Sequence, residues 1–147
     1  MPLWTLHHSP GTLAADDRRE LAGAIADLYP ILPRFYVGVV FNEAAEGSLY
    51  IGGERADRFV RISVEHIART LPTEKARTRW MERVHGVFVP FMDARELGWE
   101  LHIDETPMDL WSIQGLRPPP PDSAAEQRWI RENRPSPYET EPALGAG

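Results

Sequence analysis

The feature that most constrains the fold is a strand–helix–strand pattern that occurs twice along the chain. In the first half, an apolar segment at residues 3–7 precedes helical spacing over residues 15–29 and a β-branched, aromatic run at residues 36–41. In the second half, alternation over residues 59–67 precedes another apolar stripe at helical spacing and a last strand at residues 99–104. Two such units predict an α/β (α+β) fold, with a four-stranded sheet and both helices on one face, because right-handed crossovers place them there.

Local signals indicate where these elements begin and end. Pro30 and Pro33 stop the first helix, and Thr73 can cap the second one. The apolar stripe of that second helix consists of Ala76, Trp80, Val84, Val87, Phe88 and Phe91. Between the two halves, residues 49–51 followed by Gly52-Gly53 predict a small hairpin. One face of the sheet is left uncovered, so we expect an apolar surface there that is buried against another element or another subunit.

The composition changes after Pro107, which marks the approach to the end of the predicted domain. Four prolines at residues 118–121 are typical of polyproline II structure, and Ser123 with Glu126 forms a capping-box pattern before a short helix. We therefore expect an ordered arm rather than a linker. The predicted division is a domain at residues 2–116, an arm with a short helix at residues 117–134 and a flexible tail at residues 135–147.

Composition excludes several classes of partner. The 147 residues carry a net charge of -6, whereas nucleic-acid binding needs clustered lysine and arginine. No apolar run is long enough to span a membrane and no leader peptide is evident, so we expect a soluble, cytoplasmic protein. There is no cysteine, which removes thiolate chemistry. The histidines at positions 7, 8, 66 and 102 lack metal-ligand spacing, and we expect neither metal nor cofactor.

Four short segments occur in a fixed order on this frame. They are Met1-Pro2 at the start of a strand, Ala24-Ile25-Ala26-Asp27 late in the first helix, Phe41-Asn42-Glu43 with the following hairpin, and Glu105-Thr106-Pro107 after the last strand. In this order and spacing they resemble the cis-3-chloroacrylic acid dehalogenase group of the tautomerase superfamily. The resemblance covers residues 2–116.

The arm extends this likeness. Ile113-Gln114-Gly115-Leu116, the prolines at 118–121 and Arg134-Pro135 resemble a variant of the group that is common in fungi and whose physiological reactions are poorly defined. The resemblance implies a tautomerase β-α-β-β-α-β fold and a homotrimer. It also implies an N-terminal proline in each active site, and a small carboxylate as substrate.

The chemistry of Pro2 can be argued from the residue itself. Once Met1 is removed, Pro2 has a secondary amine whose ring fixes its direction, and burial or a nearby cation lowers the pKa of that amine toward neutrality. A proline nitrogen inside the chain has no such basicity. The structural alternative is that Pro2 only starts an edge strand.

The resemblance also implies roles for three further side chains. Arg69 matches one of the two arginines that hold the substrate carboxylate, and a guanidinium suits that task because it can donate two parallel hydrogen bonds. Pro72 stands where the second arginine would fall. His102 takes the place of a family tyrosine and Tyr29 that of a family histidine, and both can donate a hydrogen bond. The alternatives are a solvent-facing Arg69 and a structural His102 and Tyr29.

The largest departure concerns the glutamate that activates water in the dehalogenase. Its position falls on Ile113 or Gln114, and neither can act as a general base. We therefore expect an isomerase that performs keto-enol tautomerisation of a small 2-oxo or unsaturated carboxylate, with weak or no dehalogenase or hydratase (lyase) activity. The alternative function is a non-enzymatic trimeric binding or interaction protein with a vestigial pocket.

Overall fold

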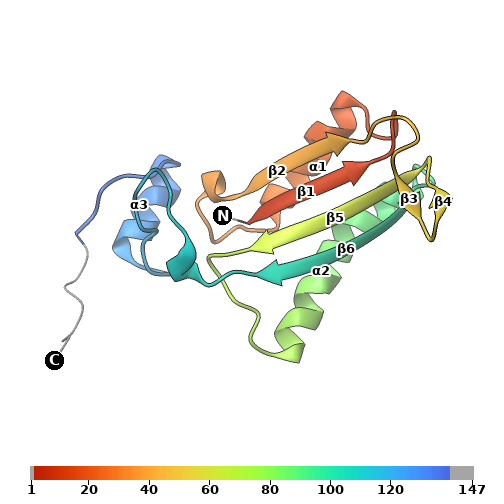
Figure 1. The fold of residues 1–147 in the computed structure, drawn as a ribbon. Coiled ribbons are helices and arrows are strands. Elements are labelled where there is room, and N and C mark those ends of the chain that lie inside the picture. Colours follow the sequence, from red (N-terminus) through yellow and green to blue (C-terminus); the bar gives the residue numbers. More distant parts are fainter. Residues whose placement is uncertain (1, 140–147) are drawn as a thin grey trace.

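The computed structural model describes residues 2–139 and contains the predicted four-stranded sheet, with strand order β2-β1-β5-β6 (Figure 1). β1 is parallel to β2 and antiparallel to β5, and β5 is parallel to β6. The strands and the two long helices have these bounds: β1 (Leu3–His8), α1 (Ala15–Asp27), β2 (Gly38–Glu43), β5 (Phe59–His66), α2 (Glu74–Asp93) and β6 (Gly98–Glu105). The predicted α+β class is confirmed.

Shorter elements fill the connections. They are the 3-10 turns η1 (Arg34–Tyr36) and η2 (Met108–Leu110), the predicted hairpin β3 (Tyr50–Ile51) with β4 (Glu54–Arg55), and α3 (Ala124–Glu132) in the arm. The strand predicted to start at residue 36 begins later. The reason is that the Tyr36 N–H donates to the Pro33 carbonyl at 2.9 Å, which keeps the chain in a turn before Gly38.

The core lies between the sheet and the two long helices, which cover the same face (Figure 1). Trp4 in β1 and Ile62 in β5 are fully buried on this face, and α2 brings Val84 and Phe88 against them. The rings of Trp4 and Phe88 stack with centroids 5.6 Å apart. The predicted apolar stripe of α2 is therefore core.

The opposite face of the sheet is mainly polar, so the expectation of an apolar uncovered face is wrong. Alternation along the strands directs most of the branched apolar residues to the helices, and Val40, opposite Thr5, is an exception on the open side. Thr5, Ser63 and His102 form one row across β1, β5 and β6. In the next row, the Arg61 guanidinium lies 3.0 Å from the Glu100 carboxylate.

The two predicted helix caps differ in outcome. Thr73 caps α2 as predicted, because its hydroxyl accepts the Ala76 N–H at 3.1 Å. Ser123 likewise accepts the Glu126 N–H at 3.2 Å, but the returning half of the capping box is missing. The Glu126 carboxylate instead accepts the Asp122 N–H at 2.7 Å and faces the body of the domain.

The arm packs on the end of the sheet at which β1 begins (Figure 1). Trp129 of α3 is fully buried, and its ring lies 5.9 Å from that of Phe35. The Phe35 N–H donates to the Asn133 side chain at 2.9 Å, and the Trp129 indole N–H donates to the Ser136 carbonyl. Residues 140–147 of the predicted tail lie outside the described residues.

Candidate active site

Pro2 lies at the end of the sheet that α3 covers. It is buried, and its carbonyl accepts the Gly38 N–H at 2.9 Å. Because β5 is antiparallel to β1, with Glu65 opposite Leu3, the last residues of β5 lie beside the start of β1. Arg69, three residues beyond β5, therefore projects from the same end of the sheet.

Arg69 is held by the arm rather than facing solvent. Its guanidinium donates to both carboxylate oxygens of Glu126, with Nη1 to Oε1 at 3.2 Å and Nη2 to Oε2 at 3.0 Å. Nη1 also donates to the Ala68 carbonyl at 2.8 Å. The Glu126 side chain is 0% exposed and that of Arg69 is 22% exposed. Arg69 thus binds a carboxylate with the predicted fork geometry, but one that belongs to its own chain.

Tyr29 lies in the core close to the same end. Its hydroxyl accepts the Trp4 indole N–H at 3.0 Å, and its ring centroid is 5.0 Å from Trp80 and 5.8 Å from His66. Burial raises the pKa of the Tyr29 hydroxyl, and the Trp4 hydrogen bond only partly opposes this. The phenol stays protonated and keeps one proton to donate.

His102 points to the open face of the sheet, away from Tyr29 and the core. Its Nδ1 contacts the Arg61 guanidinium and its Nε2 lies 3.1 Å from the Asp104 carboxylate. The side chain is 46% exposed. Within one chain, the structure brings Pro2, Arg69 and Tyr29 to one end of the sheet and leaves His102 on the open face.

The two positions that replace the family glutamate form a tight turn. Ile113 and Leu116 exchange backbone hydrogen bonds of 2.9 and 2.8 Å, and Gln114 between them has a φ of 51° and is exposed. Gln114 therefore lies at the tip of a turn on the surface.

Two buried polar residues near Arg69 were missed by the sequence analysis. One is Glu126, whose place in a capping-box pattern already gave it a structural explanation. The other is Tyr36, which the sequence pattern places at the start of a strand and which is 0% exposed. Among the described residues its hydroxyl has no hydrogen-bond partner. Nothing in their local sequence distinguishes either residue, because the defining contacts join distant parts of the chain: Glu126 of the arm pairs with Arg69 of the domain, and Tyr36 packs on Trp129 of the arm.

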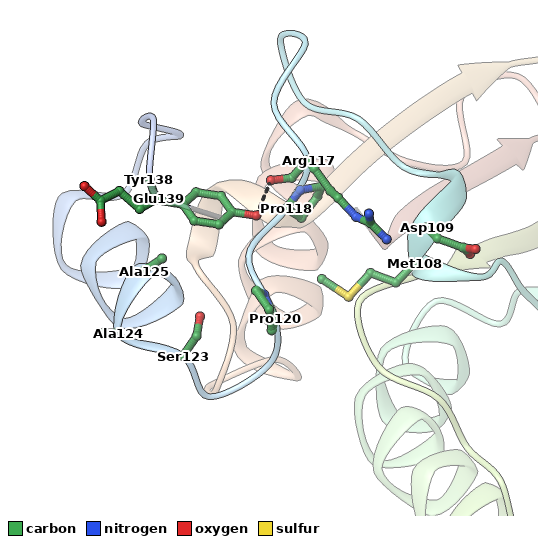
Figure 2. Close-up of a pocket in the computed structure, with 10 residues that line it drawn as sticks. All are labelled: Met108, Asp109, Arg117, Pro118, Pro120, Ser123, Ala124, Ala125, Tyr138 and Glu139. Carbon is green, nitrogen blue, oxygen red and sulfur yellow. Dashed lines mark hydrogen bonds between the residues drawn. The ribbon is translucent and has the colours of Figure 1, made fainter. Parts of the chain in front are cut away.

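A cleft of about 800 Å³ opens between η2 and the arm (Figure 2). Its lining consists of Met108, Asp109, Arg117, Pro118, Pro120, Ser123, Ala124, Ala125, Tyr138 and Glu139. The Tyr138 hydroxyl donates to the Arg117 carbonyl across it at 2.9 Å. None of the four predicted site residues lines this cleft.

No group of three or more histidine or carboxylate side chains within residues 2–139 could hold a metal ion. In the same part of the chain, no helix has both the length and the apolar character that a membrane span requires.

A family model described as "Putative oxalocrotonate tautomerase enzyme" matches residues 1–134. The chain belongs to the tautomerase superfamily. The resemblance found in the sequence is thereby confirmed, and the match extends beyond residue 116 to include α3.

Solved structures agree with this assignment. RhCC from Rhodococcus jostii RHA1 is 44% identical, with a TM-score of 0.89, over 93% of this chain and all of its own. A "probable enzyme" from the thermophilic fungus Aspergillus fumigatus is 38% identical, with a TM-score of 0.90, over 94% of this chain and 98% of its own. A member of the cis-3-chloroacrylic acid dehalogenase family, 21% identical with a TM-score of 0.71 over 90% of this chain and 98% of its own, shares the fold. No curated protein matches the sequence.

Proposed function

We propose that this tautomerase-superfamily protein is a cytoplasmic isomerase in which the nitrogen of Pro2, exposed by removal of Met1, moves a proton on a small 2-oxo or unsaturated carboxylate. The observation that carries the proposal is the burial of Pro2 at the sheet end from which Arg69 projects. Burial disfavours the protonated amine, so Pro2 can act as a base near neutral pH.

Arg69 has the proposed task of binding the substrate carboxylate. Glu126 and the Ala68 carbonyl do not use every N–H donor of the guanidinium, so a second anion can bind beside Glu126 or exchange with it. Tyr29 has the proposed role of a neutral donor behind Pro2. We propose no cofactor.

His102 joins such a site only if a neighbouring chain supplies it, because it lies on the open sheet face. We therefore propose a homotrimer in which the open sheet faces turn toward one another. Polar residues on this face, such as Arg61 and His102, would pair across the interfaces. Light scattering at micromolar concentration should give three times the chain mass of 16.7 kDa. A monodisperse particle of one chain mass would contradict the trimer.

A paired substrate assay tests the proposed reaction. The enol of phenylpyruvate needs one base and one cation, whereas cis-3-chloroacrylate also needs activated water, and neither Ile113 nor Gln114 can supply a base. We expect ketonisation to be clearly above the uncatalysed rate and chloride release to be absent or orders of magnitude slower. Chloride release as fast as ketonisation would show that the site is wrongly assigned.

The Arg69–Glu126 pair also favours a second candidate function, a non-enzymatic trimeric binding protein. An internal carboxylate on the anion-binding arginine is what a vestigial pocket would show. Mass spectrometry of the purified chain separates the two functions at little effort. Retained Met1 supports the binding protein, whereas its loss permits the enzyme.

A further inference from the structure

The buried hydroxyl of Tyr36 has no partner among residues 2–139, although every ring around it is well packed. The ring centroid of Tyr36 lies 4.7 Å from Trp111 and 6.2 Å from Trp129, edge to face in both cases, and Phe35 is 5.1 Å away. A buried hydroxyl without a partner destabilises a fold, and phenylalanine would fill the same space without this penalty. The packing therefore explains the ring of Tyr36 but not its oxygen.

Tyr36 lies at the same end of the sheet as Pro2. In the parallel pairing of β1 with β2, Leu3 is opposite Gly38, and the Pro2 carbonyl bonds to the Gly38 N–H. Tyr36 is only two residues before Gly38, so the turn η1 places it beside the start of β1. The ring of Tyr36 also contacts Trp129, which lies on the same helix as Glu126, the partner of Arg69.

The surroundings keep this hydroxyl protonated. Burial raises the pKa of Tyr36, the Glu126 carboxylate and Tyr138 raise it further, and Arg69 opposes them. Tyr36 is therefore a neutral phenol at physiological pH and can donate a hydrogen bond to an oxygen on which negative charge develops.

We propose that Tyr36 is a catalytic residue that donates a hydrogen bond to the 2-oxo oxygen of the substrate. This inference rests on the proposed function of Pro2. In ketonisation, the Pro2 nitrogen takes the enol proton, the C–O double bond forms as the C–C double bond opens, and the neighbouring carbon receives the proton. Tyr36 stabilises the charge on oxygen between the two transfers.

The arm packs against the residue that carries this oxygen. Trp129 of α3 is fully buried, and its ring and that of Trp111 both contact the Tyr36 ring edge to face. Because the Tyr36 side chain is 0% exposed, a ligand reaches its hydroxyl only when a neighbouring residue shifts, and Trp129 of the arm is one of these neighbours.

The test compares Tyr36→Phe with Tyr50→Phe, because Tyr50 is 57% exposed on the distant hairpin. For the phenylpyruvate enol we expect kcat to fall about 10²-fold in Tyr36→Phe. This is the usual effect of removing one hydrogen-bond donor to an oxygen on which negative charge develops. The melting temperature should stay unchanged or rise, since an unpaired buried hydroxyl is lost. Tyr50→Phe should match the wild type in both measurements.

The outcomes separate this inference from the proposed function. Wild-type kcat in Tyr36→Phe, together with loss of activity in a Met1-retaining form, overturns the role of Tyr36 and keeps that of Pro2. If the Met1-retaining form is as active as the processed one, the role of Pro2 fails. In that case, calorimetric titration with phenylpyruvate tests the role of Tyr36. A higher Kd for Tyr36→Phe than for the wild type supports this role. The same Kd for both proteins, or no binding by either, overturns it.

Discussion

Replacing Glu126 with alanine should lower the free energy of unfolding by about 3 kcal/mol or more, because it leaves the Arg69 guanidinium partly buried without its partner. Removal of one member of a buried ion pair typically lowers the free energy of unfolding by about 3–5 kcal/mol. Arg69 keeps 22% exposure, so water relieves part of this loss and we expect the lower end of the range. Urea unfolding followed by tryptophan fluorescence measures it, since Trp129 lies on the same helix.

Two further variants give this result its meaning. Asp27→Ala removes the partner of Arg34 in a pair of similar length, 2.9 Å, in which both side chains are more than half exposed, and its effect should stay below about 1 kcal/mol. Glu126→Gln keeps the size of the side chain and one acceptor oxygen, so its effect should be intermediate. If Glu126→Ala lowered the free energy of unfolding as little as Asp27→Ala, the Arg69–Glu126 pair would not fix the arm to the domain.

The sequence predicts the elements of this fold because their signals are local. The Thr73 cap, the Gly52-Gly53 turn and the alternation of β5 each depend on residues close together in the chain. The four-stranded sheet with both long helices on one face also follows, since right-handed crossovers place the helices there. Only the ends of the elements shift, as at Tyr36, where a hydrogen-bonded turn delays the strand.

The site is less accessible to such reasoning because its contacts join distant parts of the chain. Arg69 and Glu126 are 57 residues apart, and no periodicity links them. A capping-box pattern explained Glu126 locally, and this hid its contact with the domain. The open sheet face was misjudged for a related reason: we inferred that it must be apolar from the need for a cover, although Thr5, Ser63 and His102 on alternate positions already indicated a polar surface.

Retention of Met1 should reduce ketonisation by about 10²- to 10⁴-fold, toward the uncatalysed rate, because this is the usual contribution of a general base. The physical reason is that the Pro2 nitrogen then belongs to an amide and has no basicity. Inserting a large residue between Met1 and Pro2, verified by mass spectrometry, produces such a form. Pro2→Ala is the matched control: processing leaves a primary amine that is more flexible, so activity should fall but remain measurable.

The most direct test of the role of Pro2 is kcat/KM for the phenylpyruvate enol as a function of pH, in the processed and the Met1-retaining forms. For the processed form, we expect kcat/KM to rise with pH through a single group whose pKa lies below that of an ordinary secondary amine, because burial disfavours the charged form. The Met1-retaining form should stay near background at every pH. Full ketonisation by a verified Met1-retaining form would contradict the mechanism and leave the trimeric binding protein as the better account.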